Sequence, residues 1–149
     1  MRNFVCLLAL LASVAALAAG PYPATSQANA DIESALKLAS ESRKRVIVDF
    51  GGNWCTDCKV LDIYLHRPEN EALLAQFVFV HVNVGDKGIE TNFDVAERYG
   101  IPLKKGVPAL AVLEPDGRVI YAQKTGEFEA MRKMEPKSVN DFLVKWNRP

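Results

Sequence analysis

Two cysteines three positions apart, placed where a buried strand meets a helix, constrain this sequence more than any other feature. Residues 46–50 are β-branched and nearly all apolar, which predicts a central strand. Gly51 and Gly52 end that strand, and beyond Cys55 the apolar residues recur at helical spacing. We therefore expect Cys55 near the start of a helix and Cys58 one turn inside it.

The positions of the two sulfurs give them unequal chemistry. The partial positive charge and free amides of a helix N-terminus favour the thiolate form of Cys55, and a thiolate is the species that attacks a disulfide. Cys58 lies deeper and is expected to keep its proton until a mixed disulfide forms, and then to attack Cys55. In an exported protein, one close pair after a strand points to dithiol redox chemistry.

Two other interpretations of the pair stay open. A structural disulfide gains least from so short a loop, because the entropy it removes from the unfolded chain grows with loop length. A zinc site needs two further ligands, and the sequence offers only His66 and His81 and no second cysteine pair. We therefore expect no metal.

The N-terminus has the layout of a secretory signal peptide. No charged residue occurs between Arg2 and Asp31, and residues 4–17 are rich in Leu, Ala and Val. A transmembrane anchor needs roughly 18 or more apolar residues, whereas Gly20 and the prolines after it interrupt this run. The pattern predicts export to the periplasm and no stable membrane anchor.

An export signal divides the chain into three parts. Residues 1–19 are expected to be the signal peptide, with the cleavage site anywhere from 18 to 30. Residues 20–30, rich in Pro, Ala, Ser and Asn, are expected to form a flexible tether, and residues 31–149 a single domain. Cleavage also removes Cys6, which leaves the exported protein with one cysteine pair.

Helical and strand patterns alternate along the rest of the sequence, which predicts an α/β fold with a mixed sheet covered by helices. The last two strands flank residues 114–117, whose Pro and Gly positions suit a hairpin turn. The predicted helices are 32–43, 55–65, 69–76, 92–99 and 139–146, and the predicted strands are 46–50, 77–84, 109–113 and 118–122.

Charge and patterning exclude some partners. The 18 basic side chains balance the 18 acidic ones, so there is no overall electrostatic reason to expect nucleic-acid binding. No heptad repeat or obvious exposed apolar stripe remains once the core positions are assigned, and a monomer is expected.

Three motifs together resemble the thioredoxin superfamily, over about residues 32–147. The resemblance implies a thioredoxin fold, in which a central sheet is flanked by helices and the redox pair starts a helix. It is closest to exported thioredoxin-like proteins and to the periplasmic domain of transmembrane electron conduits. The motifs are Val48-Asp49-Phe50, then Trp54-Cys55-Thr56-Asp57-Cys58-Lys59, then Val107-Pro108 before an apolar strand.

The resemblance implies a role for each matching residue. Cys55 corresponds to the attacking cysteine and Cys58 to the resolving one. Asp49 corresponds to the buried carboxyl behind the pair, and because burial favours the protonated form of an acid, this group is expected to take the Cys58 proton. Trp54 corresponds to the tryptophan that packs beside the site, with core filling and substrate contact both open.

A proline also carries the resemblance. Val107-Pro108 corresponds to the family's cis-proline peptide, which lies against the cysteines and presents its backbone to an extended substrate. Ile101-Pro102 competes for this assignment. We prefer Val107-Pro108 because a predicted strand follows it directly.

The motif also departs from the family pattern. Thr56 and Asp57 stand between the cysteines, where members often carry Gly-Pro or Pro-His. The negative charge of Asp57 is expected to oppose thiolate formation and to bias the pair toward the reducing end. His81 stands at a strand position where a lysine usually faces the buried acid, and it is expected to modulate Asp49, with a purely structural histidine as the open alternative. Lys59 completes the expected modulating residues.

The sequence thus predicts an exported thiol-disulfide oxidoreductase that leans toward reduction and needs no metal or organic cofactor. Its expected partners are protein dithiol or disulfide substrates and a separate redox protein that recharges it. Two alternatives stay open. One is a dedicated reductant for apocytochrome or metal-site assembly, and the other is a binding module that uses the Val107-Pro108 groove without turnover.

Overall fold

A computed structural model describes residues 20–147 of the chain. The predicted signal peptide, residues 1–19, lies outside the described residues. Within residues 20–147, no helix combines the length and the apolar character needed to cross a membrane.

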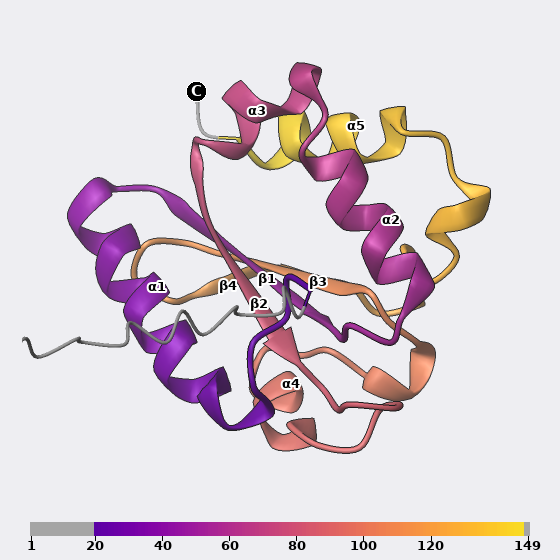
Figure 1. The fold of residues 1–149 in the computed structure, drawn as a ribbon. Helices are drawn as coiled ribbons and strands as arrows, with labels where there is room; N and C mark the ends of the chain where they lie inside the picture. The colour runs from indigo at the N-terminus through magenta and orange to yellow at the C-terminus, as the bar shows by residue number, and fades with distance from the viewer. Residues whose placement is uncertain (1–19, 148–149) are drawn as a thin grey trace, which may run out of the picture.

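A four-stranded mixed sheet forms the centre of the molecule (Figure 1). The strand order is β2-β1-β3-β4; β1 pairs in parallel with β2 and antiparallel with β3, which pairs antiparallel with β4. The apolar β1 lies inside the sheet, as its sequence predicts. The strands are β1 (Arg45–Gly51), β2 (Phe77–Asn83), β3 (Ala109–Leu113) and β4 (Val119–Ala122).

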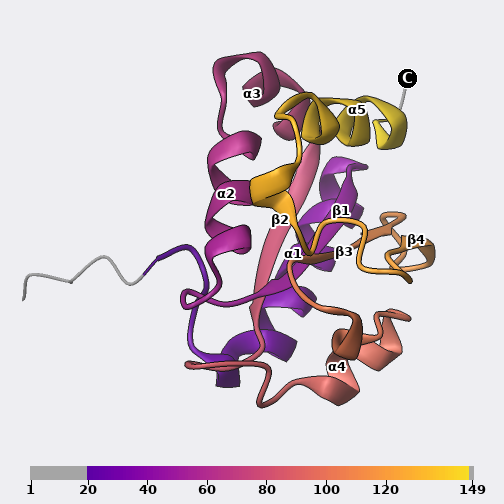
Figure 2. The ribbon, with the colours of Figure 1, turned by 90° about the vertical axis from the view of Figure 1, so that its right-hand side faces the viewer.

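Helices cover both faces of the sheet (Figures 1 and 2), which confirms the predicted α/β thioredoxin fold. One face packs against α2 (Thr56–Leu65), α3 (Pro68–Leu74) and α5 (Lys137–Trp146), and the other against α1 (Ala28–Ser42) and α4 (Phe93–Arg98). Short 3-10 turns lie at Thr25–Gln27 (η1), Leu103–Lys105 (η2) and Met131–Lys133 (η3).

Alternate residues of β1 point to opposite faces of the sheet, and this alternation positions the site. Val48 and Phe50 belong to the core on the α1 side, whereas Ile47 belongs to the core on the α2 side. Asp49 shares the face of Ile47. A carboxyl group is thereby placed under the helix that carries the cysteines.

The prediction of a flexible tether at residues 20–30 is wrong, and the domain begins before residue 31. Tyr22 is only 2% exposed and belongs to the core. Helix α1 starts at Ala28, three residues ahead of Asp31, which lies in its first turn. Burial of an aromatic ring supplies the ordering that the composition of this segment does not suggest.

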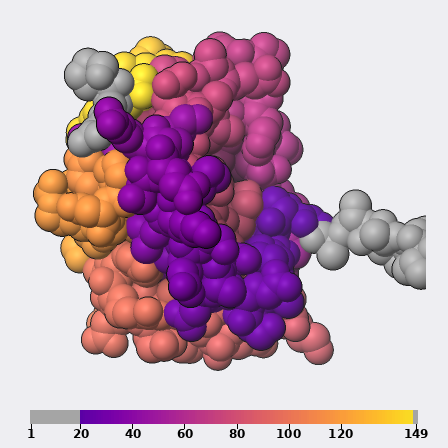
Figure 3. Space-filling view, turned by 90° about the vertical axis from the view of Figure 1, so that its left-hand side faces the viewer, coloured from indigo at the N-terminus to yellow at the C-terminus, as the bar shows by residue number. Residues whose placement is uncertain are grey.

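Asparagine side chains from three other parts of the chain hold this segment in place. We call residues 20–27 the N-terminal strap; Figure 3 shows its indigo surface lying against the body of the molecule. Asn53 Nδ2 donates to the Tyr22 carbonyl at 2.8 Å, Asn83 Nδ2 to that of Pro23 at 2.8 Å, and Asn92 Nδ2 to that of Thr25 at 2.9 Å.

Candidate active site

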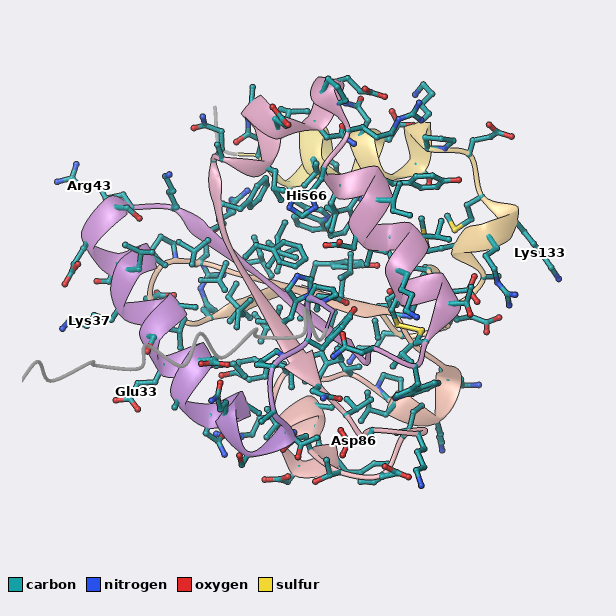
Figure 4. All side chains as sticks on the ribbon, viewed as in Figure 1. Glu33, Lys37, Arg43, His66, Asp86 and Lys133 are labelled. Atoms are coloured by element: carbon teal, nitrogen blue, oxygen red, sulfur yellow. A yellow bond between two sulfur atoms is a disulfide. The ribbon has the colours of Figure 1, made fainter. Side chains whose placement is uncertain are left out.

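The two cysteines lie at the N-terminal end of α2, joined by a disulfide (Figure 4). Cys55 is the N-cap residue, and the backbone N–H of Cys58 donates to Cys55 Sγ at 3.1 Å. Cys55 is 6% exposed and Cys58 is fully buried. A backbone donor and a helix N-terminus stabilise negative charge on Cys55, so the predicted difference between the two sulfurs has a structural basis.

An open groove of about 390 Å³ lies beside Cys55. Trp54, Ile89 and Val107 line it with apolar surface, and Glu129 and Arg132 line it with charge. Open space and an apolar wall therefore lie next to Cys55.

The peptide bond between Val107 and Pro108 is cis, as the resemblance implies. Cys55 Sγ lies 3.7 Å from the carbonyl oxygen of Val107, so this backbone borders the disulfide. The Trp54 indole N–H donates to the carbonyl oxygen of Gly85 at 2.9 Å, which holds the indole ring at the groove.

Asp49 is a buried carboxyl group, 1% exposed, whose two oxygens differ. Oδ2 accepts a hydrogen bond from Tyr22 Oη at 2.6 Å, and His81 Nδ1 lies 2.9 Å from the same oxygen. Oδ1 is buried without a hydrogen-bond partner. His81 therefore contacts the acid, and the second oxygen of the carboxyl group has no hydrogen-bond partner.

The sequence offered little indication that Tyr22 belongs to this site. Its ring packs edge-on against His81, with 4.8 Å between ring centroids. Burial raises the pKa of Tyr22 well above its ordinary value of 10.0, and the negative charge of Asp49 raises it further. Tyr22 is therefore a hydrogen-bond donor at all physiological pH values. A lone aromatic residue in a Pro-rich stretch was the available signal.

Asp57 is not the bare negative charge that its position in the motif predicts. Its carboxylate accepts from the backbone N–H of Arg132 at 2.8 Å and lies 3.1 Å from Arg132 Nη2. Partial burial raises the pKa of Asp57, but the hydrogen bonds and charge of Arg132 outweigh burial and leave the pKa below its ordinary 3.8. Arg132 therefore offsets part of the charge beside Cys55.

The remaining predicted site residues lie on the first turn of α2. Thr56 is exposed and borders the groove, and Lys59 is exposed. As for the zinc interpretation, residues 20–147 contain no group of three or more His, Cys, Asp or Glu side chains placed to hold a metal ion.

Comparison with known proteins agrees with this geometry. Residues 27–115 match a family model described as thioredoxin-like. The chain is 34% identical over 109 residues to the thioredoxin of Buchnera aphidicola subsp. Schizaphis graminum, a match that covers 73% of this chain and 88% of that protein. The chain belongs to the thioredoxin-like family.

A solved structure is also similar to this thioredoxin-like protein in both sequence and fold. The disulphide isomerase from Xylella fastidiosa Temecula1 is 36% identical, with a TM-score of 0.78 over 84% of this chain and 95% of that one. The chain is a thiol-disulfide oxidoreductase. This follows from the Cys55–Cys58 pair at the start of a helix together with the family match and these relatives.

A third relative matches over a shorter stretch. The thiol:disulfide interchange protein DsbD of Vibrio vulnificus strain CMCP6 is 36% identical over 55 residues, which is 36% of this chain. The chain spans only 9% of that protein's length.

Proposed function

We propose that this thioredoxin-like protein works after export, in the periplasm, where it reduces disulfides of other proteins. The observation that carries the proposal is the asymmetry of the pair. Cys55 borders an open groove and receives a backbone hydrogen bond, whereas Cys58 is fully buried on the face of the sheet that carries Asp49. This asymmetry supports Cys55 as the sulfur that meets a substrate and Cys58 as the sulfur that finishes the reaction.

The first half of the reaction takes place at the groove. In the reduced protein the Cys55 thiolate attacks one sulfur of a substrate disulfide. A bond forms between Cys55 Sγ and that sulfur, the substrate S–S bond breaks, and the second substrate sulfur leaves as a thiolate. The Val107 carbonyl and the Trp54 ring lie where they can position an extended substrate chain.

The second half takes place below the groove. Cys58 gives its proton to Asp49 Oδ1, directly or through water, and its sulfur attacks Cys55. The mixed disulfide breaks and the substrate sulfur leaves, taking up a proton. Two electrons have then passed to the substrate, and Cys55 and Cys58 form a disulfide. The cycle needs no metal or organic cofactor, but a separate dithiol partner must return two electrons.

Support for the reducing direction comes from Asp57. A carboxylate beside the thiols disfavours thiolate formation, and a less stable reduced form makes a couple more reducing. The pairing with Arg132 lessens this effect. Support for export comes from the charge-free, apolar N-terminal pattern, and the match to a thiol:disulfide interchange protein fits a partnership with other dithiol proteins.

The reduction potential of the Cys55–Cys58 couple tests the direction, together with insulin reduction. Equilibration with glutathione and dithiothreitol buffers should give a potential at or below roughly −230 mV, at the reducing end of the thioredoxin-fold proteins. A potential near −120 mV, typical of a strong oxidant, would contradict a reductase. Binding of insulin chains without their reduction would instead favour a binding module.

A further inference from the structure

The N-terminal strap buries one of its side chains, that of Tyr22, in the interior of the molecule. The strap is anchored on both sides of Tyr22, because Tyr22 N–H donates to Asn53 Oδ1 at 3.1 Å and the carbonyls of Tyr22 and Pro23 accept from Asn53 and Asn83. This anchoring places the Tyr22 ring against His81 of the edge strand β2.

The Tyr22 hydroxyl lies next to the resolving cysteine as well as next to the acid. A β-carbon added to Gly51 would lie 2.4 Å from Tyr22 Oη and 2.8 Å from Cys58 Sγ. Both atoms therefore border the small space that Gly51 leaves open. Since Gly51 and Asp49 face the same side of β1, the hydroxyl, the carboxyl and the sulfur share one enclosed region.

The two oxygens of Asp49 differ in their hydrogen bonding, because Oδ2 has partners and Oδ1 has none. Tyr22 Oη donates to Oδ2 at 2.6 Å, and His81 Nδ1 lies 2.9 Å from the same oxygen, where it also donates when that nitrogen carries a proton. The Tyr22 hydrogen bond favours the charged form of the carboxyl group and helps to fix its rotation. Oδ1 stays without a partner and keeps its capacity to accept a proton.

We propose that Tyr22 is a positioning residue for the resolution step, which holds Asp49 ionised and turned so that Oδ1 takes the Cys58 proton. This role rests on the proposed function, in which Asp49 is the base. Tyr22 exchanges no proton and no electrons itself. Without this hydroxyl the charged form of the buried carboxyl group loses a hydrogen-bond donor, and a protonated Asp49 cannot accept a second proton from Cys58.

The other neighbours of Asp49 come from β2, β3 and α2. The strand β3 presents an apolar neighbour, since Asp49 pairs with Leu110 there. His81 Nε2 lies 3.9 Å from Asp62 Oδ1, so a second carboxylate lies behind the imidazole. The titratable groups around the acid are Tyr22 on the strap, His81 on β2, and Cys58 and Asp62 on α2.

The test separates the two half-reactions in Tyr22→Phe, which keeps the ring against His81. Reduced protein is mixed with glutathione disulfide, quenched with acid at set times, alkylated and analysed by mass spectrometry. Loss of the dithiol reports attack by Cys55, and conversion of the glutathione adduct to the internal disulfide reports resolution by Cys58. Tyr121→Phe is the matched control, because it removes a hydroxyl from a half-buried tyrosine on β4 that packs against Phe142 and Trp146.

We expect attack to stay within about twofold of wild type and resolution at pH 6 to slow roughly tenfold, the effect of losing one hydrogen bond to a charged group. The midpoint of the pH profile for resolution should move up by about one unit, and the difference should close at high pH. The rates of both steps in Tyr121→Phe should match those of wild type. Thermal unfolding should show that Tyr22→Phe is folded at the temperature of the assay.

Two results would overturn the role of Tyr22 while leaving the proposed function intact. One is an unchanged resolution profile in Tyr22→Phe. The other is slowing by the same factor at every pH, because a loosened structure has no reason to recover at high pH. If wild-type protein forms the glutathione adduct and Cys58 never resolves it, the proposed function itself fails, and this role fails with it.

Discussion

Asp57 and Arg132 lie 75 positions apart in the chain and meet beside the attacking cysteine. Asp57 sits in the first turn of α2, while Arg132 comes from the 3-10 turn η3 and is 62% exposed. At such exposure an ion pair contributes little to stability. We propose that the pair acts on redox chemistry instead, because its charges lie beside Cys55 in the groove.

Removal of the Arg132 charge should make the couple more reducing. In Arg132→Ala, the negative charge of Asp57 is no longer offset, the Cys55 thiolate becomes less stable, and the reduction potential should fall by roughly 10–20 mV. Equilibration with glutathione buffers measures this shift. Asp57→Asn should shift the potential in the opposite direction. A more oxidising Arg132→Ala would show that the pair does not act through charge.

The same pair should leave a pH signature in stability. The pKa of Asp57 is lowered on folding, so its contribution is fully present above the unfolded value of 3.8 and is lost as the pH falls through the lower folded value. Urea unfolding of wild type and Asp57→Asn should therefore differ most at neutral pH, and the difference should shrink below pH 3.8. A difference that grew on acidification would contradict the lowered pKa.

Helix α2 both carries the cysteines and anchors the face of the sheet that holds Asp49. Leu61 lies one turn after Cys58 and is fully buried between α2 and the sheet, whereas Ile63 on the same helix is 63% exposed. The helix is thus held by one side only, and its N-terminal end stays open to the groove.

Leu61→Ala should lower the free energy of unfolding by about 2–5 kcal/mol, because a cavity remains where the buried side chain was removed. Ile63→Ala, a matched change on the exposed side of α2, should stay within roughly 0.5 kcal/mol of wild type. Urea denaturation followed by circular dichroism compares the two. Similar losses in both variants would mean that α2 is not packed through Leu61.

Most helices and strands were predictable because their apolar residues recur at helical spacing or form short β-branched runs, and both patterns are local features of the sequence. The position of the cysteine motif was predictable because an apolar strand meets a helical pattern there, whereas the expectation that His81 faces Asp49 came from the resemblance to the thioredoxin superfamily. In the structure the two residues are partners in the register of β1 and β2. The strap was not, because its order depends on Asn53, Asn83 and Asn92, which lie far along the chain. Local composition alone therefore predicts a flexible tether for such a segment.

At the scale of the whole molecule, the sheet order β2-β1-β3-β4 assembles the site from distant segments. The central strand β1 leads into the cysteines, β2 supplies His81, and the start of β3 follows Pro108. The strap closes over the remaining edge with Tyr22. This assembly places one sulfur, that of Cys55, at the edge of the groove and leaves the other, that of Cys58, fully buried, which is the arrangement that a two-step exchange requires.

Trapping of substrate adducts tests most directly the proposal that Cys55 attacks the substrate and Cys58 releases it. Cys58→Ala and Cys55→Ala are each expressed with the full chain, free thiols are alkylated, and disulfide-linked partners are identified by non-reducing electrophoresis and mass spectrometry. Cys58→Ala should accumulate covalent adducts, at least tenfold more than Cys55→Ala, because only Cys55 borders the groove and only Cys58 can release the partner. Equal trapping by the two variants, or more trapping by Cys55→Ala, would contradict the assigned roles.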